Sequence, residues 1–333
     1  MKCVRIEAYG GPEVMVLADI PVPAPGPGEV LVQVSHAGMN FMDIHTRQGK
    51  YRQSRTYPVR LPCTLGIEGA GRVVATGPEV AGFAPGDRVA WCIAWGSFAE
   101  YACVPARLLA RVPDRLGLDM AAASMFHGCT AHYLAHDVAR LAPGMSCLVH
   151  GASGGIGQIL VQMARRLGVR VFATTSSAAR AGRIRALGAD QVLDYDGGRF
   201  ADAVRDATGG HGVDVVFDAV GRETLRDSFR ATRKRGLVVN FGSVSGPLDD
   251  LDPIELGEAG SLFLTRPRLA DHMESQPVVQ SRADAVFASL LDGSLDIVIA
   301  ARHSFDTLAE GLERLEHRRS TGKPLLVVQP EAG

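Results

Sequence analysis

A glycine-rich segment near the middle of the 333-residue chain constrains the possible fold more than any other feature. It follows an apolar run of strand character, Cys147–His150, and precedes a helical run, Ile156–Leu167, that stops at Gly168. A strand, a glycine-rich turn and a helix in this order are typical of a loop that binds the phosphates of a dinucleotide. The segment reads Val149-His150-Gly151-Ala152-Ser153-Gly154-Gly155-Ile156-Gly157.

Each part of this loop has an expected task. Gly154 would let the backbone come close to a pyrophosphate, and Gly157 would let the helix pack tightly against the strand. The helix N-terminus near Gly155 would offer N–H groups and the positive end of its dipole to the phosphates. The first glycine of the usual fingerprint is replaced by Ala152, so a purely structural turn remains an alternative. We expect the loop to bind a dinucleotide through Ser153, Gly154, Gly155, Ile156 and Gly157.

The sequence around the loop alternates between strand-like and helix-like runs. Strands are expected at 170–173, 191–193, 214–217 and 237–240, and a helix at 178–187 that ends at Gly188. This alternation predicts a parallel sheet with helices on both faces, that is, an α/β doubly wound Rossmann domain over residues 122–265. Residues 1–121 are instead β-rich, with short apolar runs separated by Gly and Pro. In residues 266–333 the regular alternation of the Rossmann segment does not continue.

The residues after the second expected strand indicate which nicotinamide cofactor is bound. An NAD site usually carries Asp or Glu there, whereas this chain has Thr174-Thr175-Ser176-Ser177, followed by Arg180 and Arg183. Hydroxyl and guanidinium groups can bind a 2′-phosphate that a carboxylate would repel. We therefore expect NADPH, held in part by Thr175, Ser176 and Arg180, although both arginines could also belong to a solvated helix face.

The overall composition excludes several classes of protein. Hydrophobic residues make up 46% of the chain and charged residues 21%, and the formal net charge is −1. We expect no nucleic-acid partner, because no general positive charge is present. We also expect no membrane association, because no apolar run approaches the ~20 residues that span a bilayer. The N-terminus resembles a first strand rather than a signal peptide, which suggests the cytoplasm. The six cysteines read as small packing residues.

Several separated motifs resemble the medium-chain dehydrogenase/reductase superfamily and, within it, the NADPH-dependent quinone oxidoreductases. Their order along the chain makes the resemblance more specific than the glycine-rich loop alone. Besides that loop they are residues 37–43 (AGMNFMD), 47–51 (RQGKY), 66–73 (GIEGAGRV), 86–89 (GDRV), 128–131 (GCTA), 241–243 (FGS), 264–267 (LTRP) and 320–323 (STGK).

The resemblance implies a GroES-like catalytic domain built from both chain ends, residues 1–121 and 266–333, with the Rossmann domain inserted between them. It also implies a homodimer. Tyr195 would flank the adenosine phosphate, and Arg318 would reach it from the last helix, unless these two are a packing aromatic and a surface charge. The cofactor roles that the resemblance adds fall on Thr130, Arg180, Tyr195, Phe241, Gly242, Ser243, Phe263, Thr265 and Arg318.

The zinc-dependent members of this superfamily bind their catalytic ion with a Cys and with a His that precedes Glu. This sequence has Asn40 in place of the Cys and Ile67 in place of the His, before Glu68. Isoleucine cannot bind a metal, and zinc needs three or four N, S or O donors. We therefore expect no metal in the site.

Without a metal, the acceptor should be one that spreads the charge it gains. A quinone or an α,β-unsaturated carbonyl yields a delocalised phenolate or enolate, whereas a simple ketone yields a localised alkoxide. Asn40 and Tyr51 are the candidate catalytic residues, as neutral hydrogen-bond donors, unless they only pack the cofactor. His45 replaces an aromatic residue found in many of the similar reductases. We expect an NADPH:quinone reductase; the alternatives are an enone or enoyl double-bond reductase and a non-catalytic NADPH-binding protein.

Overall fold

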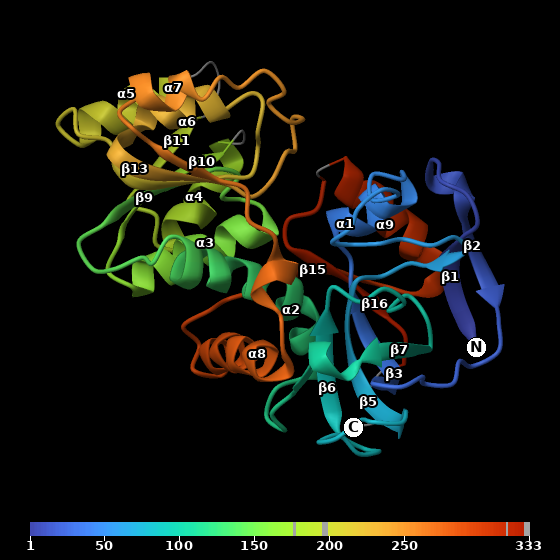
Figure 1. Cartoon of the computed structure of the whole chain (residues 1–333). Coiled ribbons are helices and arrows are strands. Elements are labelled where there is room, and N and C mark those ends of the chain that lie inside the picture. Colours follow the sequence, from blue (N-terminus) through green and yellow to red (C-terminus); the bar gives the residue numbers. More distant parts are fainter. Residues whose placement is uncertain (176–177, 195–198, 318, 330–333) are drawn as a thin grey trace. The chain divides into compact units, whose positions relative to one another are not determined.

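The computed structural model describes residues 1–175, 178–194, 199–317 and 319–329. The chain forms two compact units, one made of Met1–Cys129 with His272–Gly333 and the other of Thr130–Asp271. The second unit is therefore a continuous insertion in the first, as expected for a Rossmann domain within a GroES-like domain (Figure 1).

The inserted unit is built on a parallel sheet of six strands in the order β11-β10-β9-β12-β13-β14. This is the strand order of a doubly wound Rossmann sheet. Successive strands are added outward on one side of the first strand and then, from the fourth strand on, outward on its other side. Ligands of such sheets bind outside the carboxyl ends of the strands at this change of side, here β9 and β12. The strands are β9 Ser146–Val149, β10 Arg170–Thr175, β11 Gln191–Asp194, β12 Val213–Asp218, β13 Thr232–Asn240 and β14 Phe263–Thr265.

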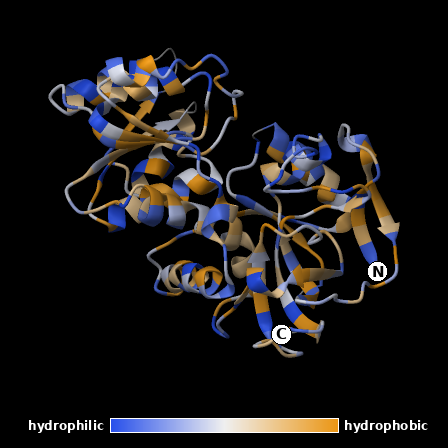
Figure 2. Cartoon of the chain, viewed as in Figure 1, coloured by the Kyte–Doolittle hydropathy of each residue, from blue (hydrophilic) through white to orange (hydrophobic). Residues whose placement is uncertain are grey.

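Helices cover both faces of this sheet, with α5, α6 and α7 on one side and α3 and α4 on the other (Figure 1). Because both faces are covered, the central strands contain buried apolar runs, such as Cys147–Val149 of β9 and Val215–Phe217 of β12, and Figure 2 shows orange along much of this sheet. Phe172 of β10, Phe200 of α5 and Phe229 of α6 belong to one buried cluster on the first side. The helices are α3 Gly155–Arg166, α4 Ala178–Ala186, α5 Arg199–Ala207, α6 Leu225–Ala231 and α7 Ile254–Glu258.

The discontinuous unit contains two sheets, one of three strands and one of seven. The smaller has the order β2-β1-β4; the larger runs β15-β16-β3-β5-β6-β8, with β7 also paired to β3. The C-terminal strand β16 pairs antiparallel with β3 and so joins the two chain segments in one sheet. The strands are β1 Lys2–Ile6, β2 Met15–Asp19, β3 Glu29–Gly38, β4 Cys63–Thr64, β5 Glu68–Thr76, β6 Arg88–Cys92, β7 Tyr101–Pro105, β8 Leu109–Arg111, β15 Ile299–His303 and β16 Lys323–Val327.

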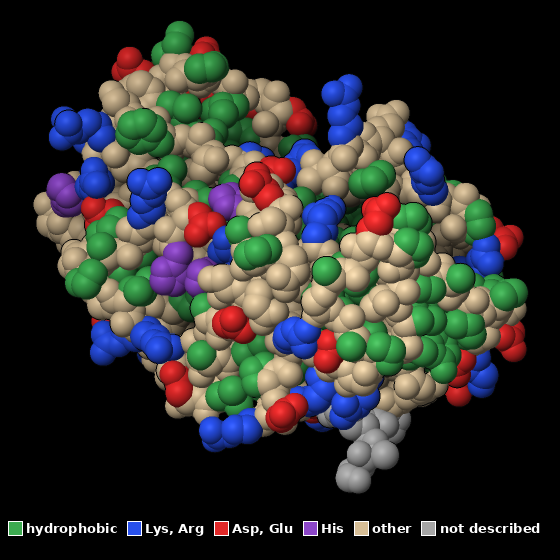
Figure 3. Space-filling view, turned by 60° about the horizontal axis from the view of Figure 1, so that its bottom comes forward, with side chains coloured by type: hydrophobic (Ala, Val, Ile, Leu, Met, Phe, Trp, Pro, Cys, Tyr) green, Lys and Arg blue, Asp and Glu red, His purple; other side chains and the backbone are tan. Residues whose placement is uncertain are grey.

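The helices of the discontinuous unit are α1 Phe41–Arg47, α8 Gln276–Leu291 and α9 Leu308–Glu316, together with most of α2 Leu118–Tyr133. Helix α2 continues into a π-helical turn, Leu134–Val138. On the face drawn in Figure 3, positive and negative side chains are interspersed, as the net charge of −1 suggests.

Candidate functional site

The glycine-rich loop follows β9 and leads into α3. Gly151 has a φ of +62°, in the left-handed region that glycine adopts without a steric penalty. The Ala152 N–H donates to the Thr174 carbonyl oxygen at 3.1 Å, and the Gly154 N–H donates to the Gly151 carbonyl oxygen at 2.8 Å. The tight turn that a fingerprint glycine would make at position 152 is therefore made one residue earlier.

The start of α3 fits a phosphate group. A Cβ at Gly157 would lie 2.4 Å from the Gly151 carbonyl oxygen and 2.8 Å from the Ala152 Cα, so a glycine is needed for the helix to begin this close to the loop. No side chain caps the helix at Gly154. The first N–H groups of a helix have no acceptor within the helix, so those of α3 can bind an anion. Ser153, Gly155 and Ile156 complete this turn.

A buried network of hydrogen-bonded polar side chains supports the loop. His150 Nδ1 lies 2.9 Å from Thr174 Oγ1, and His150 Nε2 lies 3.0 Å from Ser228 Oγ. The Ser228 hydroxyl donates to Asp218, whose carboxylate also accepts the N–H of Gly221 after β12. Burial lowers the pKa of His150, so the imidazole is neutral near pH 7. The network ties the carboxyl ends of β9, β10 and β12 together.

The segment after β10 carries the residues expected to choose between NADPH and NADH. Thr175 ends β10 and is buried, Arg180 on α4 is half-buried, and Arg183 is exposed. Asp194 lies on the neighbouring strand β11, and the strand register places it opposite Thr175. Ser176 and Ser177, together with Tyr195 and Arg318, lie outside the described residues.

The turn after β13 is held close to the sheet. A Cβ at Gly242 would lie 2.3 Å from the Ala219 carbonyl oxygen, so this position also needs glycine. The Arg266 guanidinium donates to the carbonyl oxygens of Asn240 and Gly242, at 2.8 and 2.9 Å. Phe263, on the last strand β14, is 64% exposed. The remaining cofactor candidates are Phe241 and Ser243 of this turn, half-buried and exposed respectively, the half-buried Thr265 of β14 and the buried Thr130 of α2.

In the other unit, Asn40 stands just before α1 and is only 2% exposed. Its amide nitrogen donates to Glu68 at 2.8 Å and to the Gly38 carbonyl oxygen at 3.1 Å. Its amide oxygen accepts from Lys323 Nζ at 2.6 Å, and Lys323 also pairs with Glu68. Both amide N–H groups of Asn40 are therefore used by protein acceptors.

Asp43 lies one helical turn further along. One of its carboxylate oxygens accepts the Asn40 backbone N–H at 2.7 Å, while the other, Oδ1, has no hydrogen-bond partner among the described residues. Burial raises the pKa of Asp43 to about 7. This carboxyl group is therefore partly protonated at neutral pH.

Tyr51 lies in a cluster of aromatic rings. Its ring centroid is 6.2 Å from that of His45, 5.9 Å from that of Tyr57 and 6.5 Å from that of Trp95, while His45 also faces Phe41 at 6.3 Å. Burial, helped by the nearby charge of Lys50, lowers the pKa of His45 to about 4. The cluster thus offers flat apolar surfaces and a neutral imidazole.

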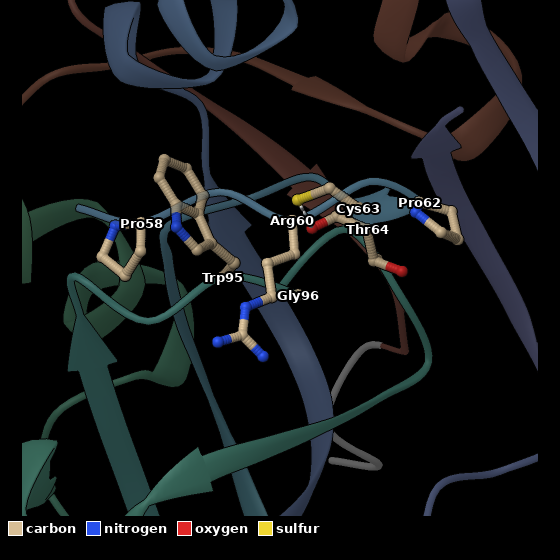
Figure 4. Close-up of a pocket in the computed structure, with 7 residues that line it drawn as sticks. All are labelled: Pro58, Arg60, Pro62, Cys63, Thr64, Trp95 and Gly96. Atoms are coloured by element: carbon tan, nitrogen blue, oxygen red, sulfur yellow. Dashed lines mark hydrogen bonds between the residues drawn. The ribbon is translucent and has the colours of Figure 1, made fainter. Parts of the chain in front are cut away.

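A pocket of about 400 Å³ adjoins this cluster through Trp95. Figure 4 shows Pro58 and Trp95 on one side and Pro62 on the other, with the Arg60 guanidinium group extending between them. Cys63, Thr64 and Gly96 complete the lining. Burial raises the pKa of the Cys63 thiol to about 11, which leaves Arg60 as the charged group of the pocket.

Comparisons with known proteins identify the family. A model of the alcohol dehydrogenase GroES-like domain matches residues 26–114, and a model of zinc-binding dehydrogenases matches residues 155–312. A quinone oxidoreductase of Pseudomonas aeruginosa is 36% identical over 98% of this chain and 99% of its own length. The chain belongs to the quinone oxidoreductase family of the medium-chain dehydrogenase/reductase superfamily.

Two further relatives of this quinone oxidoreductase family member bear on its function. The crystal structure of an Escherichia coli quinone oxidoreductase complexed with NADPH is similar with a TM-score of 0.92 and 31% identity, covering 98% of this chain and 100% of that one. A 2-haloacrylate reductase of a Burkholderia species is 35% identical over 97% of this chain and 98% of its own length. The expected family and fold are therefore confirmed.

Sequence reasoning about this quinone oxidoreductase family member missed three groups. It did not single out the pairing of Lys323 with Glu68, the support of the loop by His150, or the binding of the β13 turn by Arg266. A buried polar residue directly after an apolar strand, such as His150 after Cys147–Val149, is the signal that could have indicated the support of the loop. No local pattern connects Lys323 with Glu68.

Two structural findings concern metals and membranes. Within residues 1–175, 178–194, 199–317 and 319–329, no three His, Cys, Asp or Glu side chains gather as a metal site would require. Ile67 is fully buried beside Glu68, and Asn40 is engaged as described. In the same ranges, no helix is both long and apolar enough to cross a bilayer. The absence of a metal from the working enzyme stays a prediction.

Proposed function

We propose that this protein is an NADPH-dependent quinone reductase that works without a metal ion. The observation that carries the proposal is the uncapped N-terminus of α3, set against the glycine-rich loop by the missing Cβ of Gly157. Such a terminus is an anion site at the carboxyl edge of the sheet, where a dinucleotide pyrophosphate belongs. Relatives named as quinone oxidoreductases, one of them complexed with NADPH, support the assignment.

On the cofactor side, the chain's own residues bind and orient. Ser153, Gly155 and Ile156 offer loop and helix N–H groups to the phosphates, and Gly154, whose N–H donates to Gly151, keeps the turn closed beside them. Thr175 and Arg180 are suited to a 2′-phosphate. We assign the nicotinamide end to the Phe241–Ser243 turn, the Phe263–Thr265 strand and Thr130. When bound, NADPH supplies a hydride to the acceptor.

On the acceptor side, the chain offers flat surfaces and neutral polar groups. The rings around Tyr51 suit a planar conjugated acceptor. Reduction of a quinone leaves a phenolate whose charge is spread over the ring, so neutral donors suffice to stabilise it. Tyr51 is the candidate for direct contact because its ring belongs to this aromatic cluster, whereas the buried Asn40 amide lies against Glu68 and Gly38. Asn40 would then act by holding Lys323 and Glu68 in place.

Reduction of a conjugated carbon–carbon double bond is the second candidate. It is favoured by the 2-haloacrylate reductase, whose sequence is nearly as similar as those of the quinone oxidoreductases. Both reactions deliver a hydride to a conjugated acceptor and leave a delocalised anion.

A screen of NADPH oxidation tests the proposal. Benzoquinones and naphthoquinones should be reduced, and saturated ketones such as cyclohexanone should not. Asn40→Ala should lower kcat/KM about tenfold, because Lys323 and Glu68 lose the amide that holds them in place. Turnover of enones or enoyl thioesters but not of quinones would favour the second candidate, and efficient reduction of cyclohexanone would contradict the mechanism.

We also propose that the protein is a cytoplasmic homodimer, on the strength of its resemblance to the family. Light scattering of the purified chain measures the mass in solution, and a monomer at micromolar concentration would contradict the dimer. Fractionation of the source cells tests the compartment.

A further inference from the structure

The loop between α1 and β4 carries an unusual concentration of positive charge. Residues 50–60, here called the basic segment, contain Lys50, Arg52, Arg55 and Arg60 and no acidic residue. In the whole chain, 35 basic residues balance 36 acidic ones, so the segment departs from the general composition. A local excess of one sign attracts oppositely charged ligands.

The positive charges of the basic segment are not neutralised by ion pairs with the described residues of the protein. All four basic side chains are exposed, and among the described residues none of them forms a hydrogen bond or an ion pair with a carboxylate. Arg47, only three residues earlier, is buried and pairs with Glu316 at 2.7 Å. The contrast shows that the fold neutralises a neighbouring arginine but leaves the segment open to solvent.

One of these charges lies in a pocket with apolar walls. Arg60 lines the cavity of about 400 Å³ together with Pro58, Pro62 and Trp95. In Figure 4 no dashed line joins its guanidinium group to another drawn residue. Trp95 connects the pocket to Tyr51, and Tyr57 of the basic segment packs edge-on against Tyr51. A flat ring and an anionic group could therefore be bound together here.

We propose that this pocket binds conjugated acceptors that carry an anionic substituent, with the ring against Trp95 and the anion at Arg60. The inference rests on the proposed reductase activity and names its substrate class. Lys50, Arg52 and Arg55 raise the local concentration of such acceptors through longer-range attraction, which salt screens. His45 contributes no charge at neutral pH, and no carboxylate lines the pocket. A sulfonate, a carboxylate or a phosphate ester shares the required chemistry.

A binding experiment tests the pocket without relying on turnover. Naphthalene sulfonate and neutral naphthol, which share a ring system and cannot accept a hydride, are titrated into the full chain by calorimetry. The sulfonate should bind more tightly than the naphthol. Added salt should weaken the binding of the sulfonate but not that of the naphthol. Arg60→Gln should weaken sulfonate binding about three- to fivefold, as for a partly exposed ion pair, and leave naphthol within about twofold.

Arg107→Gln is the matched control, because Arg107 is also exposed and does not line the pocket. It removes the same charge and should change neither affinity. The proposal is wrong if the sulfonate does not bind, if Arg60→Gln weakens both ligands equally, or if the two variants behave alike.

A kinetic arm separates this inference from the proposed function. The ratio of kcat/KM for naphthoquinone sulfonate to that for naphthoquinone should fall about three- to fivefold in Arg60→Gln, since differences in intrinsic reactivity cancel between the two proteins. An unchanged ratio would overturn the inference while leaving the reductase intact. Absence of any quinone turnover would instead contradict the proposed function, and the binding result would still decide the pocket. An enoyl thioester of coenzyme A is then added as a competitor of naphthalene sulfonate. Displacement of the sulfonate would indicate that the pocket accepts a phosphorylated ligand, and no displacement would indicate a small anionic one.

Discussion

Lys323 and Glu68 form an ion pair in which both side chains are buried, although 255 residues separate them in the sequence. Glu68 also accepts the Phe126 backbone N–H at 2.6 Å and the Asn40 amide, so its carboxylate is fully engaged. The pair stands beside Asn40 and Ile67, the positions at which zinc-dependent relatives are expected to hold their metal. A protein ammonium group thus supplies a positive charge at this place.

Breaking this pair should destabilise the protein strongly. Lys323→Met leaves a buried carboxylate without its counter-charge and should lower the free energy of unfolding by about 3–5 kcal/mol. Lys323→Met combined with Glu68→Gln should recover part of that loss, because no uncompensated charge remains. Urea unfolding measures the effect, with Lys2→Met at an exposed site as control. A loss no larger than that of the control would show that the pair contributes little.

Arg180 should favour NADPH over NADH. A charge-assisted hydrogen bond to the 2′-phosphate is worth about 1.5–3 kcal/mol, so Arg180→Ala should weaken NADPH binding about tenfold or more and leave NADH unaffected. Arg183→Ala, on the exposed face of the same helix, is the matched control. Dissociation constants of both cofactors measure the effect. Equal affinity of the wild-type protein for NADPH and NADH would contradict the assignment.

Asp43 should make stability depend on pH. Its pKa is about 7 when folded and about 4 when unfolded, so folding takes up a proton between these values. The stability that protonated Asp43 provides is present in full below pH 4 and is lost as pH rises through 7. Asp43→Asn keeps an acceptor for the Asn40 N–H and cannot ionise, so its advantage over the wild type should grow across that window.

Urea unfolding at several pH values measures this difference, with the exposed Asp114→Asn as control. A difference between wild type and Asp43→Asn that stays constant from pH 4 to pH 8 would contradict the shifted pKa.

Chelators should have no effect on the enzyme. Asn40 and Ile67 stand where zinc ligands would be, and Asn40 is already hydrogen-bonded to Glu68 and Lys323. We expect EDTA to change neither quinone reduction nor the melting temperature. Elemental analysis provides the second measurement, and zinc at one equivalent, lost together with activity, would refute the prediction.

Elements defined by local pattern could be predicted closely from the sequence. The expected helix 156–167 is observed as α3, Gly155–Arg166, and Gly168 just after it has the positive φ that ends helices at glycine. Helix α8, Gln276–Leu291, also begins at a local start signal, because Ser275 precedes it and Pro277 occupies its first turn.

The sequence by itself determined the dinucleotide loop and the class of fold, because a strand, a glycine turn and a helix follow one another within a few residues and need only local conformation. Only the tertiary structure decided what surrounds Asn40. The pairing of β16 with β3, and the hydrogen bond from the Met39 N–H to the Pro324 carbonyl oxygen, bring Lys323 to Glu68 and Asn40. The same holds for the pocket that joins Arg60 to Trp95. Such contacts depend on strand register between distant segments, which no local pattern encodes.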